Sequence, residues 1–157
     1  MTADEPDDHA LGRSRGGFGT KLNILCDAAG RPVAAVLAAG QSAEVRSLID
    51  LLLAACVLLV AWPARLACDR AYSAGWVRRL LRLCGMKAVI PYRKNEHGAK
   101  RRGGGYDRVA YRGRNVVERL VGWLKERRRI ATRYEKLAVN YRAMVHIAFI
   151  LHYLKHP

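Results

Sequence analysis

The sequence predicts an α/β protein with a mixed sheet. Two patterns support this fold class. An antiparallel hairpin signal comes first in the chain, and two short apolar strands separated by a helix follow it. The 157 residues are enough for one domain, and 51% of them are hydrophobic, which allows a packed core and excludes wholesale disorder.

The first expected elements are a hairpin and a helix. Residues 20–26 and 32–37 are strand-like runs, and residues 27–30 between them supply turn chemistry that ends in glycine. We expect these two runs to pair antiparallel. A helical stretch follows over residues 43–59.

The next elements are two buried strands with a helix between them. Residues 65–68 and 87–90 are short apolar runs that suit buried strands. Residues 74–83 have the pattern of an amphipathic helix. Ser73 is the expected N-cap of this helix, and Gly85 is placed to end it.

The remaining stretches are predicted to be irregular at the start and helical at the end. Residues 1–17 are acidic and then rich in glycine and arginine, so they are expected to form an irregular lead-in. Residues 100–105 are basic and glycine-rich, which is typical of a flexible loop. Two helices, over residues 115–129 and 135–154, are expected to finish the chain.

The net charge indicates a polyanionic partner. The chain has 28 Lys and Arg against 13 Asp and Glu, a formal charge of +15. This excess is compatible with nucleic acid or with an anionic membrane surface. The stretch from Arg93 to Lys136 contains fifteen Lys or Arg and five acids, or +10 of the +15. Phosphate binding explains this stretch better than a merely soluble surface, and Arg101 and Arg102 are expected to bind DNA there.

Compartment and membrane signals favour the cytoplasm. Residues 51–62 are continuously apolar, but a membrane span needs about 20 such residues, so a core helix is the better interpretation. The acidic first eight residues do not resemble a signal peptide. The four cysteines lack the spacing of zinc ligands and suit buried, reduced thiols.

One helix face combines a carboxylate with cations. On a helical wheel from Asn115 onward, Arg114, Glu118 and Lys125 lie within about 40° of one another, and Tyr111 joins them if the helix begins early enough. The opposite interpretation is an ordinary i,i+4 ion pair between Arg114 and Glu118. The apolar arc of the same helix contains Val116, Val117, Leu120, Trp123 and Leu124, with Val121 at its edge.

Asp69 is the second candidate acid. It follows the predicted strand over residues 65–68, and the carboxyl ends of strands are where α/β sheets place their ligands. The alternative role for this side chain is to cap the next turn. Together, Asp69 and Glu118 offer the hard oxygen ligands that Mg²⁺ prefers, and nearby cations would hold phosphates.

At these residues the sequence resembles the DDE transposases of insertion sequences, in particular insertion-sequence family five. The hallmark of that family is a Tyr, Arg, Glu, Lys pattern with two, three and six residues between successive members, and Tyr111, Arg114, Glu118 and Lys125 match it without a gap. Further familial stretches occur in order along the chain at residues 11–17, 20–21, 30–32, 68–73, 111–119 and 129–138.

The resemblance implies an RNase H-like fold, a mixed sheet with helices on both faces. It also implies two aspartates and a glutamate that bind Mg²⁺ or Mn²⁺, with Asp69 as the second acid and Glu118 as the third. Tyr111, Arg114 and Lys125 would contact phosphates at the transposon end. The activity would be metal-dependent cleavage and transfer of DNA strands at the terminal inverted repeats and the target DNA.

The family's first aspartate lies on a strand upstream of residues 12–17, so this chain is expected to lack that central strand. Residues 18–157 would form a partial RNase H-like catalytic domain that is inactive alone. Its expected partners are DNA, an upstream segment or frame-shifted reading frame, and further copies in the active complex, but no membrane. The alternative is a non-catalytic DNA-binding remnant that competes for transposon ends.

Overall fold

The computed structural model describes residues 9–93, 96 and 107–155. The chain divides into two units. The first comprises Met1–Ser42 and Val116–Pro157, and the second comprises Ala43–Asn115. The first unit is therefore discontinuous in sequence. It contains both the residues before the second unit and the C-terminal helices that follow it.

The predicted hairpin is confirmed in the first unit. Strand β2 (Gly17–Cys26) pairs antiparallel with β3 (Pro32–Ala39), with Leu22 opposite Leu37. The Asp27 carboxylate accepts the backbone N–H groups of Ala29 and Arg31, each at 2.9 Å. Gly30 has a φ of 87°, which glycine adopts without strain.

The expected irregular lead-in contains a strand, which corrects the prediction for residues 1–17. Strand β1 (Gly12–Ser14) pairs antiparallel with Gly17–Gly19, the first residues of β2. The Ser14 hydroxyl donates to the Gly17 carbonyl at 2.9 Å across the turn, and Gly17 has a φ of 111°. The glycines that suggested irregularity therefore serve a tight hairpin.

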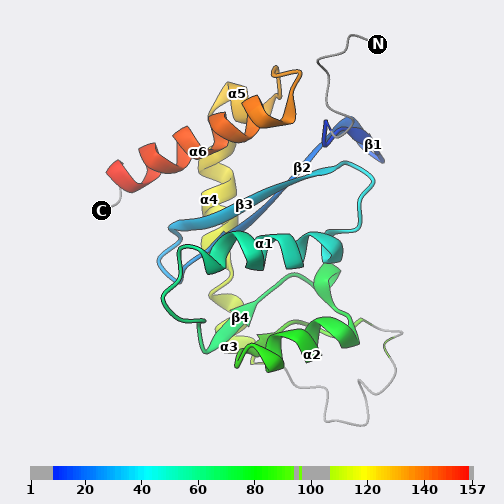
Figure 1. Ribbon diagram of the computed structural model, residues 1–157, viewed down its shortest axis with the longest axis vertical. Coiled ribbons are helices and arrows are strands. Elements are labelled where there is room, and N and C mark those ends of the chain that lie inside the picture. Colours follow the sequence, from blue (N-terminus) through cyan, green and yellow to red (C-terminus); the bar gives the residue numbers. More distant parts are fainter. Residues whose placement is uncertain (1–8, 94–95, 97–106, 156–157) are drawn as a thin grey trace. The chain divides into compact units, whose positions relative to one another are not determined.

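Helices α4 (Asn115–Lys125), α5 (Arg128–Ala131) and α6 (Ala138–Lys155) complete the first unit. The single helix predicted over residues 115–129 is interrupted, because Arg127 has extended backbone angles and starts α5. Its guanidinium lies over the Trp123 ring at 4.4 Å. Helix α6 begins three residues later than predicted and packs against β3 (Figure 1).

The core of the first unit joins these helices to one face of the hairpin. Leu120 and Leu124 are buried as the helical wheel predicts. They cluster with residues from α5 and α6, namely Ile130, Tyr141, Val145, Ala148 and Phe149. Leu22, Ile24 and Leu37 of the hairpin pack against this cluster. The hairpin therefore depends on α4 and α6 for its hydrophobic cover.

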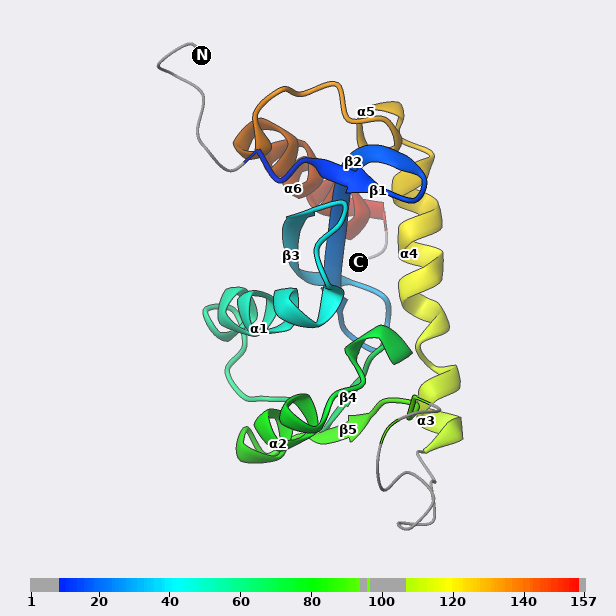
Figure 2. The same ribbon diagram turned by 90° about the vertical axis from the view of Figure 1, so that its right-hand side faces the viewer.

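The predicted strands of the second unit are confirmed as a parallel pair. Strand β4 (Arg65–Ala67) pairs with β5 (Lys87–Val89), with Leu66 opposite Ala88. Helix α2 (Gly75–Leu83) packs against β5, and Figure 2 shows it alongside the pair. The antiparallel and parallel strands of the described residues thus lie in two small sheets, where the sequence predicts one mixed sheet.

The capping prediction is confirmed at the C-terminal end of α2 and is wrong at its N-terminal end. Gly85 ends the helix as predicted: its φ is 75°, its N–H donates to the Arg82 carbonyl, and the Met86 N–H donates to the Leu81 carbonyl at 2.8 Å. Ser73 is not the N-cap, because Ala74 occupies that position without a side-chain bond. The Ser73 hydroxyl instead bonds to Glu96.

The apolar run over residues 51–62 is only partly a core helix. A 3-10 turn, η1 (Glu44–Arg46), leads into α1 (Ser47–Cys56), which buries Leu51, Leu52 and Ala55. Val57, Leu58 and Val60 lie beyond the helix and are exposed. The helix ends at Cys56, earlier than predicted, and the apolar residues that follow it have no buried face. No helix among the described residues is long and apolar enough to cross a membrane.

A short helix, α3 (Arg108–Arg112), lies within the stretch before residue 115 that carries no predicted element. The Asp107 carboxylate caps it by accepting the Ala110 N–H at 2.9 Å, and it also pairs with Arg65 at 3.1 Å. The aspartate is therefore the local signal that determines where α3 begins.

Candidate active site

Asp69 lies two residues beyond the end of β4, at the carboxyl end of the parallel pair. Its carbonyl accepts the Tyr72 N–H at 3.0 Å and begins the 3-10 turn η2 (Arg70–Tyr72). Its side chain is exposed and makes no capping hydrogen bond. The structure thus does not support the capping role that the sequence left open, and the carboxylate is accessible to a ligand.

A cation accompanies Asp69 at this strand end. The pKa of the buried Cys68 thiol is raised to about 12, mainly by burial and further by the charge of Asp69, while Arg114 and Arg78 oppose the increase. Both Asp69 and Arg114 therefore lie within electrostatic reach of the same thiol. Within the second unit, the chain brings the candidate acid and one of the predicted phosphate-binding cations to the same end of β4.

Tyr111 and Arg114 also lie together, at the end of α3. The Arg114 backbone N–H donates to the Tyr111 carbonyl at 3.0 Å. The Arg114 guanidinium carbon is 5.4 Å from the centre of the Tyr111 ring. Both side chains are half-buried. Contact with the ring restricts the guanidinium, which preorganises it for a planar or anionic partner.

Glu118 and Lys125 are exposed on α4, in the first unit. They are seven positions apart, so they share one side of the helix about 10.5 Å apart along its axis. Leu120 and Leu124, which are buried, face the core from the same helix. Two members of the predicted charged stripe, Glu118 and Lys125, are thus exposed on α4, whereas the third, Arg114, precedes the helix and is half-buried.

The predicted site residues are distributed over both units. Asp69, Tyr111 and Arg114 belong to the second unit, and Glu118 and Lys125 belong to the first. Arg101 and Arg102 lie outside the described residues. Among the described residues, no group of three His, Cys, Asp or Glu side chains is placed to hold a metal ion. The chemistry of the two carboxylates fits Mg²⁺, but two acids are not a complete ligand set.

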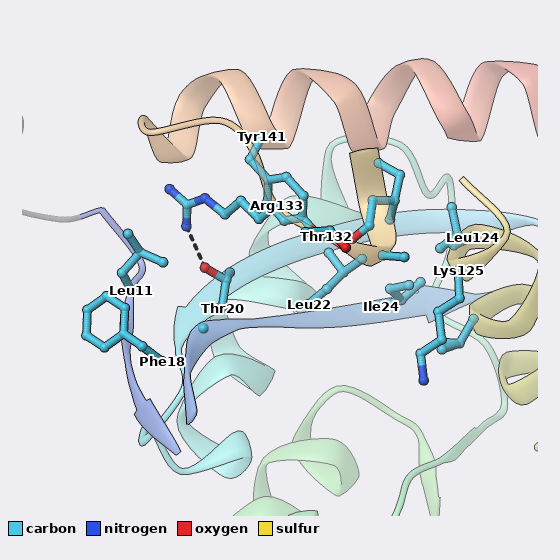
Figure 3. A pocket seen from close by; sticks show the side chains of 14 residues that line it. Leu11, Phe18, Thr20, Leu22, Ile24, Leu124, Lys125, Thr132, Arg133 and Tyr141 are labelled. Atoms are coloured by element: carbon cyan, nitrogen blue, oxygen red, sulfur yellow. Dashed lines mark hydrogen bonds between the residues drawn. The ribbon is translucent and has the colours of Figure 1, made fainter. Parts of the chain in front are cut away.

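A pocket of about 600 Å³ in the first unit was not predicted from the sequence. Leu22 and Ile24 of β2 and Leu124 of α4 line it, and Lys125 lies at it as well (Figure 3). Figure 3 also shows the Arg133 guanidinium hydrogen-bonded to the Thr20 hydroxyl. The carbonyls of His9, Glu135 and Lys136 take further donors of this guanidinium, so Arg133 has a structural role.

A polar cluster that contacts the turn after Asp69 was also not predicted from the sequence. Arg78, Arg93 and Glu96 bond to one another or to the turn that follows Asp69. No periodic pattern in the sequence indicated it, because the ion pair between Arg78 and Glu96 joins segments that lie far apart in the chain.

Comparison with known proteins identifies the family. Residues 3–153 match the family model of the transposase DDE domain. The chain belongs to this transposase family. A protein of Burkholderia cepacia named "Putative transposase for insertion sequence element IS402" is 34% identical over 138 residues, which cover 84% of this chain and 59% of that protein. No solved structure gives a significant match.

Membership confirms the resemblance to insertion-sequence DDE transposases that is seen in the sequence. DDE transposases are a family of enzymes that act in the transposition of DNA. The chain spans 59% of the length of the relative that it matches. The roles of individual residues, the metal and the activity of the whole protein are therefore matters for proposal.

Proposed function

We propose that this chain is the catalytic part of an insertion-sequence transposase that cleaves and transfers DNA strands, with Asp69 and Glu118 among its metal-binding carboxylates. The observation that carries the proposal is the Asp69 carboxylate. It is exposed at the carboxyl end of β4 and is not used as a cap. The charges of both Asp69 and Arg114 act on the neighbouring Cys68 thiol. A carboxylate with a nearby cation suits a site for metal and phosphate.

Asp69 and Glu118 would hold Mg²⁺ or Mn²⁺, which when bound activates an attacking oxygen and stabilises a leaving one at phosphorus. Tyr111, Arg114 and Lys125 would position the phosphates of the transposon end, and Arg101 and Arg102 would add contacts that are independent of base sequence. DNA, as terminal inverted repeats and target, is thus the proposed partner, and further copies of the chain would join it in the active complex. The cytoplasm is the proposed compartment.

The unpaired edge of β2 supports the missing-strand part of the proposal. The Gly40 N–H donates to the Gly19 carbonyl, so alternate residues Lys21 and Asn23 make the ladder bonds to β3. By the same alternation the peptide groups of Leu22 and Ile24 point the other way, where β1 pairs only with Gly17–Gly19 and no described strand runs beside these two residues. The pocket follows these same residues. An upstream apolar strand carrying the first aspartate would pair along this edge and fill the pocket, completing an RNase H-like sheet.

The test uses the transposase in which an upstream segment with that strand precedes this sequence in one chain. Asp69→Asn and Glu118→Gln remove the charge that attracts a divalent cation and keep the shape of the side chain. Each variant is expected to lose strand cleavage at the inverted repeats while retaining binding to those ends. Cleavage is measured on end-labelled DNA, and binding is measured by fluorescence anisotropy.

Three outcomes are informative. Full cleavage by either variant would show that the acids are misassigned. The 157-residue chain alone is expected to bind DNA without cleaving it, and cleavage by this chain that disappears in Glu118→Gln would contradict the missing-strand proposal. If the longer protein binds ends and never cleaves, the chain is instead a non-catalytic protein that competes for transposon ends.

A further inference from the structure

The turn that follows Asp69 is held by a side chain from the segment after β5. The Arg93 guanidinium donates to the carbonyls of Ala71 at 2.6 Å and Arg70 at 3.3 Å. These are the two residues immediately after Asp69. One arginine therefore bridges the segment that carries the candidate acid and a segment more than twenty residues further along the chain.

Glu96 is the centre of this connection. Its carboxylate accepts the Ser73 hydroxyl and the Arg93 backbone N–H at 3.2 Å, and it forms an ion pair with Arg78 at 3.5 Å. Glu96 thus contacts both the last residue of the turn after Asp69 and the arginine that binds its first carbonyls.

Arg78 fixes the other side of Glu96. Its guanidinium donates to the Ser73 hydroxyl at 2.9 Å and to the Ile90 carbonyl at 3.1 Å. The same guanidinium lies 3.8 Å from the centre of the Tyr92 ring. Arg78 therefore contacts Ser73, the Tyr92 ring and Ile90, the residue that follows β5. These contacts leave its guanidinium little freedom to follow the Glu96 carboxylate if the carboxylate moves.

The ion pair is largely screened from water. The side chains of Arg78 and Glu96 are 14% and 18% exposed. Burial by itself raises the pKa of the Glu96 carboxyl, but the Ser73 hydroxyl, the Arg93 N–H and Arg78 outweigh it and lower the pKa below its usual value. Glu96 is therefore ionised at neutral pH, and its charge is matched by Arg78.

We propose that Glu96 is a positioning residue for Asp69, acting through Ser73 and Arg93 to fix the turn that presents the catalytic carboxylate to its metal. The proposal rests on the assignment of Asp69 as a metal ligand. Asp69 has an exposed side chain and makes no capping bond, so its direction depends on the backbone of residues 69–73. The Glu96 cluster holds the carbonyls of Arg70 and Ala71 and the hydroxyl of Ser73. Removing a group that orients a metal ligand typically costs about 10–100-fold in metal affinity or activity.

The experiment compares Glu96→Gln with Glu135→Gln in the longer transposase that includes the upstream segment. Glu135 is a matched control because it is also poorly exposed, at 12%, and pairs with an arginine, Arg129, at 3.5 Å. It lies in the first unit, whereas the turn after Asp69 belongs to the second. Two quantities are measured: the Mg²⁺ concentration for half-maximal strand cleavage, and hydrogen exchange of the Tyr72 and Ser73 amides.

Glu96→Gln is expected to raise the half-saturating Mg²⁺ concentration about tenfold or more, with cleavage recovered at high Mg²⁺, and to speed exchange at Tyr72 and Ser73. Glu135→Gln is expected to change neither quantity. An unchanged Mg²⁺ dependence in Glu96→Gln, while Asp69→Asn abolishes cleavage, overturns the positioning role and leaves the assignment of Asp69 intact. Normal cleavage in Asp69→Asn overturns the assignment itself. A general loss of cleavage in Glu96→Gln without recovery at high Mg²⁺ assigns Glu96 a structural role only.

Discussion

Two tyrosine hydroxyls donate to backbone carbonyls at the same distance but at different depths. The Tyr141 hydroxyl donates to the Ile130 carbonyl at 2.8 Å inside the core, where Tyr141 is 5% exposed. The Tyr153 hydroxyl donates to the Pro32 carbonyl at 2.8 Å, and its side chain is 42% exposed. Water can replace the hydroxyl at Tyr153 but not at Tyr141.

Tyr141→Phe is therefore expected to destabilise the protein more than Tyr153→Phe. Losing the buried bond leaves the Ile130 carbonyl without its donor, which costs about 1–3 kcal/mol, whereas the surface variant should cost less than about 1 kcal/mol. Urea unfolding of the two variants measures the difference. Equal losses would mean that the Ile130 carbonyl reaches water when the hydroxyl is removed.

At the scale of single elements, the free edge of β2 makes a residue-by-residue prediction. The Lys21 and Asn23 amides bond to β3, while the Leu22 and Ile24 amides face the opposite side, where β1 reaches only Gly17–Gly19. We expect Leu22 and Ile24 to exchange faster with solvent deuterium than Lys21 and Asn23 in the 157-residue chain. Adding the upstream segment should slow Leu22 and Ile24 selectively. Uniform protection along β2 without that segment would exclude an open edge.

The sequence predicted elements wherever local chemistry was unambiguous. The hairpin followed from its turn residues, the end of α2 followed from Gly85, and the buried face of α4 followed from its apolar period. The failures have tertiary causes. The Asp107 carboxylate that caps α3 also forms an ion pair with Arg65, which lies far away in the chain. The Ser73 hydroxyl does not cap α2 because it bonds to Glu96.

The candidate residues of the site could be chosen from the sequence, but the side chains that hold the turn after Asp69 could not. Asp69 at a strand end and the stripe on α4 could be located from sequence spacing alone. Arg78, Arg93 and Glu96 could not, because the Arg78–Glu96 ion pair and the Arg93–Ala71 hydrogen bond join segments far apart in the chain, and no periodicity encodes such contacts.

At the scale of the whole molecule, the charge of +15 predicts DNA binding that depends strongly on salt. Affinity should fall by roughly 0.9 log units per phosphate contact for each decade of salt concentration. Replacing Arg101 and Arg102 by alanine should weaken binding to all duplex sequences alike and make the salt dependence shallower. Titrations of a labelled duplex at several salt concentrations measure both effects. Affinity that hardly changes with salt would contradict a phosphate-dominated interface.

The discontinuous first unit has a consequence for the order in which the protein folds during its synthesis. Its hairpin is made early, but α4 and α6, which cover the hairpin, follow the whole of the second unit. On the ribosome, the second unit is complete once Asn115 has emerged, while Leu22 and Ile24 still await their packing partners. Nascent chains with exposed apolar surface are substrates for chaperones. The hairpin of this transposase is therefore exposed to misassembly until α6 has been synthesised.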